Sequence, residues 1–264
     1  MYLKYEGADF KLGWSESIER HLIKQAIKKK VGKWIGKPYQ PDSYLNFATK
    51  LLAHLPSSII VDVGANIGTT VLPLAVKFPS AKFYAVEPHP VPAAKFIRNC
   101  TRNQVNNVSL LTAAIGLEGK TAQIYTHPTN SGGHRLTGFS GRKDVEQFPI
   151  FGPIAVPMKP LSDVFDDFGI SRCNLLKIDT EGYEVFVLES LNDKLQPNTI
   201  QHVIAELGPE GLRQAGKSAW DLVSLMLERG YVCRVLGSNK TIDCEKEVPI
   251  LPDFTVVDLV FSSS

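Results

Sequence analysis

The hydrophobic positions of the chain fall into short apolar runs separated by longer amphipathic stretches. The runs at Ile59–Val63, Ala81–Val86 and Val108–Ala113 are mostly apolar and have the length of buried strands. Between them, Thr69–Phe78 and Ala93–Gln104 carry apolar residues that can pack a helix against a sheet. This series predicts parallel strands joined by crossover helices, and therefore a doubly wound α/β fold.

The same alternation resumes in the second half of the chain. Helices are expected at Leu161–Phe168 and Trp220–Arg229. Four further strands are expected, at Cys173–Ile178, Thr199–Leu207, Tyr231–Leu236 and Phe254–Phe261.

An interruption at residues 116–160 separates the two halves. Strands are expected near its ends, at Thr121–Thr126 and Ile154–Met158, with a polar, glycine-rich span between them. We interpret this segment as a hairpin that carries a lid, since long irregular spans in compact domains often serve function. Taken singly, each polar residue of the span is expected to be exposed to solvent. Four of them could contact a substrate: His127, Asn130, His134 and Arg135.

Residues 1–57 are expected to form a helical extension ahead of the main domain, residues 58–264. Ile18–Lys37 has helical spacing and many lysines, which favours a packing helix with a solvated lysine face. Contact with an anionic membrane surface is the alternative for this helix. A second helix is expected at Tyr44–Leu55.

Composition limits the function classes. Lysine and arginine total 29 and aspartate and glutamate total 27 among 264 residues, which argues against a nucleic-acid partner. The four cysteines are widely spaced and form no CxxC pair, as expected in a reducing compartment. No apolar run approaches the roughly 20 residues of a membrane span. No signal peptide is visible in Met1–Gly13, so a cytoplasmic protein is expected.

A glycine-rich turn after the first strand of the main domain is the first candidate site. Asp62 ends that strand, and Gly64, Asn66 and Gly68 follow before the next helix. Glycines let a ligand approach the backbone, and the free N–H groups of a helix start attract anionic groups. Glu87 ends the next strand, where a carboxylate can accept hydrogen bonds from both hydroxyls of a ribose. A nucleotide-like cofactor is therefore expected here.

Carboxylates at later strand ends are the candidates for catalysis. Asp179 follows the fourth strand, at the crevice where doubly wound sheets bind ligands, and Lys177 shares its side of the strand. We take Asp179 as the first choice for a catalytic or acceptor-orienting carboxylate, with Glu206 on the neighbouring strand. His134 is an alternative general base, because imidazole titrates near neutral pH. A cluster of Asp179, Glu181 and Glu206 could bind magnesium, which prefers such oxygen ligands. The sequence alone does not place these carboxylates within bonding range of one another, so no metal is predicted.

Several motifs occur in a fixed order between about Ser58 and Leu207. They are VDVGANIG (Val61–Gly68), VEP (Val86–Pro88), a helix with Asn99 and Asn103, and LKIDTEGYE (Leu176–Glu184). Together they resemble the FkbM-type S-adenosylmethionine-dependent methyltransferases. The resemblance implies a Rossmann-like class I methyltransferase fold, with a seven-stranded, mostly parallel sheet whose last strand is antiparallel.

The resemblance also implies a cofactor, S-adenosyl-L-methionine, and roles for the candidate residues. Glu87 would hold the ribose, and Asp179 would lie at the edge of the cofactor site. Pro88 and His89 would shape the adenosine site, and Thr112 and Ala113 would contact the adenine. The methionine part would be surrounded by the residues of the glycine-rich turn, Asp62, Gly64, Ala65, Asn66 and Gly68.

The function that follows is transfer of a methyl group to a hydroxyl of a sugar, a glycolipid or a secondary metabolite. Methylation of nitrogen on a small molecule shares every cofactor motif. A nicotinamide dehydrogenase also combines a glycine turn with a strand-end acid, although the turn here is not GxGxxG. A cofactor-binding scaffold without turnover is the non-enzymatic alternative. The expected partner is a small-molecule or glycan acceptor, and nothing in the sequence indicates an oligomeric state.

Overall fold

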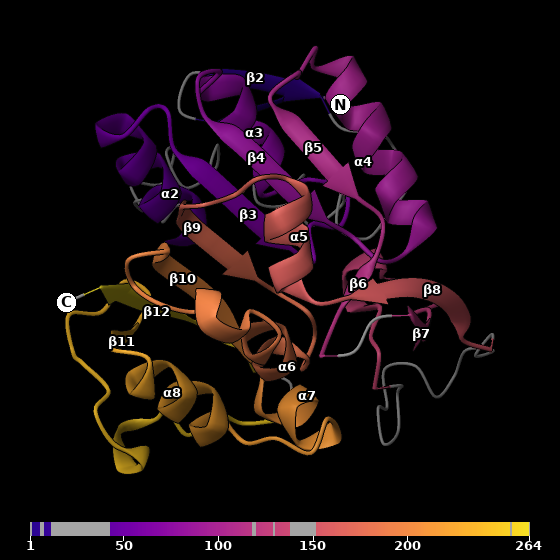
Figure 1. Ribbon diagram of the computed structural model, residues 1–264. Helices are drawn as coiled ribbons and strands as arrows, with labels where there is room; N and C mark the ends of the chain where they lie inside the picture. Colours follow the sequence, from indigo (N-terminus) through magenta and orange to yellow (C-terminus); the bar gives the residue numbers. More distant parts are fainter. Residues whose placement is uncertain are drawn as a thin grey trace, which may run out of the picture.

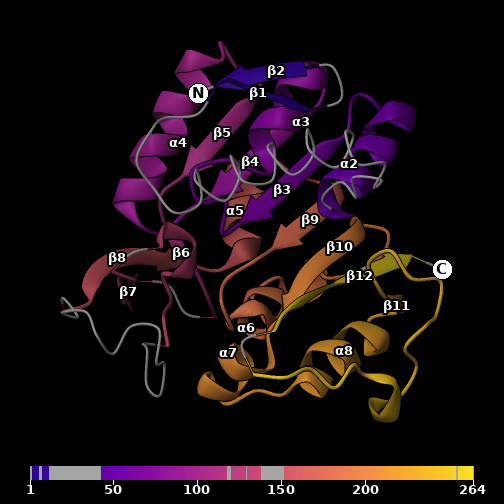
Figure 2. The ribbon, with the colours of Figure 1, turned by 180° about the vertical axis from the view of Figure 1, so that it is seen from behind.

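The computed structural model describes residues 2–5, 8–11, 43–117, 120–128, 130–137, 152–253 and 255–263. Its centre is a seven-stranded sheet in the order β11-β12-β10-β9-β3-β4-β5 (Figures 1 and 2). The strands are β3 (Ile59–Val63), β4 (Lys82–Val86), β5 (Val108–Leu111), β9 (Cys173–Ile178), β10 (Ile200–Leu207), β11 (Tyr231–Val235) and β12 (Val257–Ser263).

The sheet has the predicted mixture of strand directions. β12 runs antiparallel to both β10 and β11, whereas the other neighbouring strands are parallel. From β3 the chain moves outward through β4 to β5 and later returns to β9 on the other side of β3. The strand order therefore reverses between β3 and β9, which is where open α/β sheets bind ligands. The Rossmann-like, mostly parallel fold is confirmed.

Helices cover both faces of the sheet, which explains why its strands are continuous apolar runs. One core cluster joins β3, β9, β10 and β12 residues to α2 (Ser43–His54), α3 (Val71–Lys77) and α4 (Pro90–Arg102). The other joins the opposite sheet face to α5 (Leu161–Asp167), α6 (Glu184–Glu189) and α8 (Ala219–Glu228). Successive side chains of one strand point to opposite faces, so Ile60 lies in one cluster and Val61 in the other.

The helix boundaries differ from the sequence prediction where local chemistry decides them. α4 begins at Pro90 rather than Ala93, because His89 caps it by accepting a hydrogen bond at Nδ1 from the Val91 N–H, 3.2 Å away. Proline at the first position suits a helix start. A short helix, α7 (Pro209–Gln214), was not predicted.

The segment between the two halves of the sheet forms a small sheet of its own, in the order β6-β8-β7. β7 (Lys120–Ile124) and β8 (Ile154–Lys159) are antiparallel and match the predicted hairpin, whereas β6 (Ala114–Ile115) was not predicted. After β7 the chain turns through a short 3-10 helix, η1 (Ser131–Gly133), and returns with Arg135 paired to Tyr125.

The described part of the N-terminal extension begins with strands that the helical prediction did not include. β1 (Tyr2–Tyr5) and β2 (Ala8–Lys11) form an antiparallel pair. The predicted helix at Ile18–Lys37 lies outside the described residues, whereas α2 matches the helix predicted at Tyr44–Leu55. None of the helices in the described ranges is both long and apolar enough to cross a membrane.

Candidate active site

A cavity of about 460 Å³ lies at the carboxyl ends of β3, β4, β9 and β10, where the strand order reverses. Its volume is within the range of about 300–1,000 Å³ that is usual for small-molecule sites. The strand ends contribute Gly64, Glu87, Asp179 and Glu206. Across from them, residues 130–136 of the inserted segment also line the cavity, with position 133 excepted. The inserted segment therefore covers a pocket that the sheet builds.

The glycine turn after β3 is shaped by close approach to β9. Gly64 has φ +86°, and a Cβ atom there would lie 1.8 Å from the carbonyl oxygen of Asp179. Gly68 has φ +88°, and its Cβ would lie 2.6 Å from the ring of Phe96 on α4. Asn99 of α4 donates from Nδ2 to the Ile67 carbonyl at 3.0 Å and so fixes the turn to α4. Gly64 therefore lets the turn pack against the backbone of Asp179, just after β9, whereas Gly68 allows close packing of α4.

Glu87 is buried at the end of β4 and is fixed by the backbone. Its Oε1 accepts from the His89 N–H at 2.8 Å, and its Oε2 accepts from the Asn66 N–H at 2.9 Å. Burial raises the pKa of Glu87 to about 7, against the opposing effect of these two hydrogen bonds. Each carboxylate has about four acceptor sites, so two hydroxyl donors from the cavity can still be bound.

Asp62 lies beneath the cavity floor rather than in its lining. Its Oδ2 accepts from the Thr70 hydroxyl, and its Oδ1 lies 3.9 Å from Nζ of Lys177. Asp62 and Lys177 are paired residues on β3 and β9, and both are buried. Burial raises the pKa of Asp62, while Lys177 opposes the shift. Asp62 therefore acts on the cavity through Thr70 and Lys177, which do line it.

Three carboxylates meet at the other end of the cavity. Asp179, Glu181 and Glu206 each place an oxygen within 4.8 Å of the others. Nζ of Lys177 lies 2.9 Å from Oδ2 of Asp179, as expected for two residues on one side of a strand. Burial raises the pKa of Glu206 well above its ordinary value, and the charges of its carboxylate neighbours add to this. Oxygen clusters of this kind suit magnesium, but here Lys177 already pairs with one of the three.

Glu184 organises the turn that carries these carboxylates. Its Oε1 accepts from the N–H groups of Thr180 and Gly182 and from the Thr180 hydroxyl, at 2.9, 3.1 and 3.0 Å. This turn includes Glu181 in a left-handed conformation, with φ 58°. Glu184 therefore serves as a structural residue at the start of α6.

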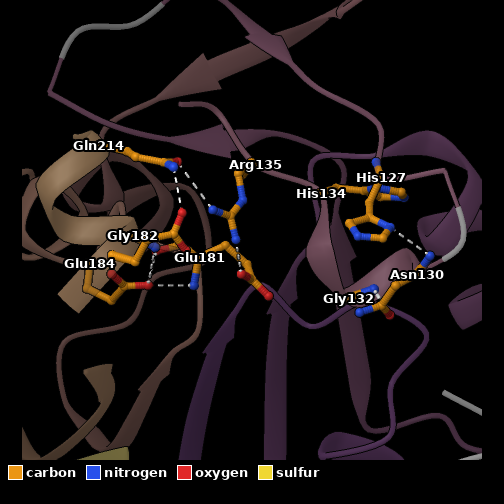
Figure 3. A network of polar contacts seen from close by, with 11 residues as sticks. His127, Asn130, Gly132, His134, Arg135, Glu181, Gly182, Glu184 and Gln214 are labelled. Carbon is orange, nitrogen blue, oxygen red and sulfur yellow. Dashed lines mark hydrogen bonds and ion pairs between the residues drawn. The ribbon is translucent and has the colours of Figure 1, made fainter. Parts of the chain in front are cut away.

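The inserted segment is tied to this end of the cavity by Arg135 (Figure 3). Its Nη2 lies 2.5 Å from Oε2 of Glu181, and its Nη1 donates to Oε1 of Gln214 on α7 at 3.4 Å. Arg135 is only 2% exposed. The expectation of a solvent-exposed side chain was wrong for Arg135 and for His127, which is also buried.

The histidines of the segment form a second cluster, visible on the other side of Figure 3. His134 accepts at Nδ1 from the His127 N–H at 2.9 Å, and its ring stacks on that of His89 with centroids 4.2 Å apart. Burial, with the nearby His89 and His127, lowers the pKa of His134 to about 3. An engaged Nδ1 and a lowered pKa argue against a role for His134 as a general base.

The remaining predicted residues divide between the cavity lining and its support. Thr112 is exposed and lies outside the lining, and His89 caps α4 instead of facing the cavity. Sequence reasoning missed Thr70, Thr180 and Tyr183, although the last two lie inside the LKIDTEGYE motif. The predicted catalytic and cofactor-binding residues that line the cavity are Gly64, Ala65, Asn66, Glu87, Pro88, Ala113, His134, Asp179 and Glu206, and of the possible substrate contacts Asn130 and Arg135 line it as well.

This lining fits an adenosine-containing methyl donor. Glu87 offers the carboxylate that a ribose requires, and the carboxylates of Asp179 and Glu206 can face a positive charge. The buried Oδ1 of Asn66 has no hydrogen-bond partner among the described residues, so it is available to a donor group of a ligand. Ile115 and Ile124 add an apolar wall. One end of the cavity thus suits a nucleoside, and the other suits a cation.

The chain is similar in sequence to proteins named methyltransferases. Methyltransferase 1 of Beauveria bassiana (strain ARSEF 2860) is 31% identical over 161 residues, covering 57% of this chain and 64% of its own length. The 31-O-demethyl-FK506 methyltransferase FkbM of Streptomyces tacrolimicus is 32% identical over 173 residues, covering 58% and 66%. This chain therefore spans just under two thirds of each relative.

Among solved structures, a putative caffeoyl-CoA O-methyltransferase from Staphylococcus aureus aligns over 93% of this chain and 97% of its own, with 9% identity and a TM-score of 0.49. The family model described as the methyltransferase FkbM domain matches residues 62–233. Because that match covers well over half of the sequence, this chain belongs to the FkbM methyltransferase family.

Proposed function

We propose that this methyltransferase uses S-adenosyl-L-methionine to methylate a hydroxyl group of a sugar, a glycolipid or a secondary metabolite. The proposal rests on one observation. A single cavity holds a buried carboxylate fixed by backbone N–H groups, Glu87, at the end of β4 and an acidic group, Asp179 with Glu206, at the ends of β9 and β10. The name of the Streptomyces tacrolimicus relative, 31-O-demethyl-FK506 methyltransferase, refers to an oxygen that lacks its methyl group, which supports a hydroxyl acceptor.

The donor half of the cavity would hold the cofactor without large rearrangement. Glu87 is already oriented by the Asn66 and His89 N–H groups, so its remaining lone pairs can accept ribose hydroxyls. Asn66 would offer its buried Oδ1 to a donor group of the cofactor. When bound, the cofactor supplies a methyl group made electrophilic by the attached sulfonium. The chain's own task is then to position an acceptor oxygen and remove its proton.

We assign proton removal to Glu206 and orientation of the acceptor to Asp179. A general base works best when its pKa is near the working pH, and burial raises the pKa of Glu206 toward that range. Asp179 is held by Lys177 at 2.9 Å, so its carboxylate is already committed to an ion pair. Asp179 can still accept a hydrogen bond from the acceptor and hold it in place. The first choice from sequence, Asp179, thus becomes the orienting partner.

Calorimetric titration with S-adenosylhomocysteine, NAD and NADP tests the donor site. The wild type should bind S-adenosylhomocysteine and neither nicotinamide nucleotide. Glu87→Ala should weaken that binding by about 1.5–3 kcal/mol, since hydrogen bonds to a charged acceptor are lost. Glu228→Ala is the matched control, because Glu228 is an exposed residue of α8 outside the cavity lining. Preference for a nicotinamide nucleotide, or no binding at all, would refute the proposed donor.

Methylation of nitrogen is the second candidate, because the donor half of the cavity would be the same. The two are distinguished by the product. A purified methylated product whose new methyl carbon resonates as a methoxy group would support oxygen as the acceptor atom. An N-methyl resonance would refute it.

A further inference from the structure

The helix α2 (Ser43–His54) lies outside the region that the family model matches, residues 62–233. It nevertheless lies beside β9 and β10, the strands that carry the acidic end of the cavity (Figures 1 and 2). Its buried residues include Tyr44, Ala48 and Leu52, which recur every four positions and so share one side of the helix. That side packs against the sheet, with Tyr44 at its beginning.

The sheet face that α2 covers also carries charged residues of the site. Three apolar residues of the central strands pack in one core cluster with Tyr44: Ile60, Leu175 and Ile204. Side chains two positions apart in a strand point to the same face. The residues two positions further along β3, β9 and β10 are Asp62, Lys177 and Glu206. Tyr44 therefore lies on the side of the sheet to which these three side chains point.

Tyr44 places its ring beside the ammonium of Lys177. Nζ of Lys177 lies 5.8 Å from the centre of the ring. This is within the distance of about 6 Å over which an aromatic face attracts a cation. Tyr44 is 2% exposed, and the side chain of Lys177 is 7% exposed. The attraction is strongest where water is excluded, as it is here.

Lys177 has two carboxylates within reach, and the ring adds a third contact. Nζ lies 2.9 Å from Oδ2 of Asp179 and 3.9 Å from Oδ1 of Asp62. A lysine ammonium is a compact charge on a flexible stem, so two carboxylates do not by themselves fix where it lies between them. The contact with Tyr44 stabilises the position that the structure shows, in which the ammonium is bound to Asp179.

We propose that Tyr44 is a positioning residue for methyl transfer: its ring holds the Lys177 ammonium at Asp179 and so fixes the carboxylate that orients the acceptor. The inference rests on the proposed function for the role of Asp179. It adds to the site a residue from the helix that precedes the matched family region, residues 62–233.

NMR of the full chain, with lysine labelled with ¹⁵N at Nζ, tests the position of the ammonium. The signal of Lys177 is the one that is absent from Lys177→Arg. Asp179→Asn should shift this signal in the wild-type background, because the ammonium is in contact with Asp179. It should shift the signal equally in Tyr44→Phe, which keeps the ring and removes the hydroxyl with whatever that group contacts. In Tyr44→Leu, Asp179→Asn should have little effect on it.

Turnover with the acceptor that the product analysis identifies measures the consequence for the reaction. Tyr44→Leu should lower kcat about tenfold, because a misplaced orienting group loses the alignment of acceptor and methyl group. Tyr44→Phe should restore most of this loss, since an aromatic face is again present. The Kd of S-adenosylhomocysteine should change little in either variant.

Phe47→Leu is the matched control. Phe47 lies one turn further along α2, and its ring contacts His202 of β10 edge to face, with centroids 5.3 Å apart. This variant also removes an aromatic ring that packs α2 on the sheet, so a general loosening of α2 would appear in it as well. It should leave the Lys177 signal and kcat as in the wild type.

A second substitution covers the case in which Tyr44→Leu does not fold. A phenylalanine with a fluorinated ring at position 44 keeps nearly the same volume and weakens the negative charge of the ring face. Compared with Tyr44→Phe, it should reduce both kcat and the response of the Lys177 signal to Asp179→Asn.

The outcomes separate the two proposals. If the wild type fails to bind S-adenosylhomocysteine, the proposed function is refuted, whereas the NMR comparison still decides whether Tyr44 holds Lys177. If it binds that compound, but Asp179→Asn shifts the Lys177 signal equally in the wild type and in Tyr44→Leu, only the role of Tyr44 is refuted. The same holds if Phe47→Leu lowers kcat as much as Tyr44→Leu, or if Tyr44→Phe restores nothing.

Discussion

Nζ of Lys177 lies 2.9 Å from Oδ2 of Asp179, at the point where β9 ends beside β3. The same ammonium lies 3.9 Å from Oδ1 of the buried Asp62 on β3. Burial alone would lower the pKa of Lys177, but the two carboxylates hold it above its usual range. Lys177 therefore stays positively charged and pairs both with Asp62, beneath the cavity, and with Asp179 in the cavity lining.

Replacing this lysine should destabilise the fold. In Lys177→Met, Asp62 is left buried without its cation, and breaking a buried ion pair costs about 3–5 kcal/mol. The side chain of Asp179 is 38% exposed, so water can solvate this carboxylate once the lysine is removed. The loss of stability therefore comes mainly from the buried Asp62. Urea unfolding at neutral pH measures the difference.

The control for this variant is the double change Asp62→Asn with Lys177→Met. If the cost comes from the unpaired carboxylate, the double variant should be more stable than Lys177→Met alone. Equal stability of the two would contradict the electrostatic explanation.

The features that the sequence predicts correctly depend on residues that are close together in the chain. β3 and β9 are buried on both faces, so their apolar runs were recognised, and β9 was predicted with its observed bounds. Strand alternation also placed Lys177 beside Asp179 correctly. The strand-end carboxylates followed from the same elements, because the ends of parallel strands share one edge of the sheet.

Sequence reasoning failed where a residue's environment is set by a distant partner. Arg135 looked like an exposed loop residue, but its partners Glu181 and Gln214 lie 46 and 79 positions away in the chain. His134 looked like a base, but its stacking on His89 and its bond to the His127 N–H depend on how the inserted segment folds back. No periodicity in the sequence encodes such contacts.

The rate of methyl transfer should rise with pH through the pKa of Glu206. A base must be deprotonated to act, and burial with neighbouring carboxylates raises the pKa of Glu206. The acid limb of the pH–rate profile should therefore lie at higher pH than the ordinary pKa of glutamate would give. Glu181→Gln removes one neighbouring charge and should move the limb to lower pH. Profiles of kcat against pH for the wild type and Glu181→Gln check this.

Glu206→Gln complements that profile. It should lower kcat by about 10²–10⁴-fold, the usual contribution of a general base, and leave S-adenosylhomocysteine binding unchanged. Full activity in Glu206→Gln, or an acid limb that does not respond to Glu181→Gln, would remove Glu206 from the mechanism.

Glu87 should make the folded state less stable as pH rises. Its pKa is about 7 in the folded chain and near 4.5 when unfolded, so between these values the folded state binds more protons. Stability is therefore lost as pH rises across that window, by at most about 1.4 kcal/mol per pH unit. Glu87→Gln cannot ionise, so its stability relative to the wild type should increase from pH 4.5 to 7. Denaturant titrations of both proteins at several pH values measure this, and parallel curves would contradict the raised pKa.

Arg135 should hold the inserted segment over the cavity. In Arg135→Met, the ion pair to Glu181 and the bond to Gln214 are lost, so residues 130–136 should exchange their amide hydrogens faster. Because His134 and Leu136 line the donor cavity, affinity for S-adenosylhomocysteine should fall roughly tenfold, or about 1.4 kcal/mol.

Arg213→Met is the control for this variant. The side chains of Arg213 and its ion-pair partner Asp253 are 59% and 62% exposed, and such pairs contribute about 0–1 kcal/mol to stability. Equal exchange in the two variants would show that Arg135 is not the anchor.

Methyl transfer should not depend on a divalent cation, although Asp179, Glu181 and Glu206 lie within 4.8 Å of one another. Lys177 pairs with Asp179 and Arg135 with Glu181, so two of the three carboxylates already have a positive partner. The raised pKa of Glu206 also disfavours the charged form that a magnesium ion would need. Dialysis against EDTA should leave turnover unchanged, and added magnesium should not increase it. If EDTA abolished activity and magnesium restored it, the ion would have to displace Lys177 and Arg135 from these carboxylates. The assignment of Glu206 as a base that acts without a metal would then be wrong.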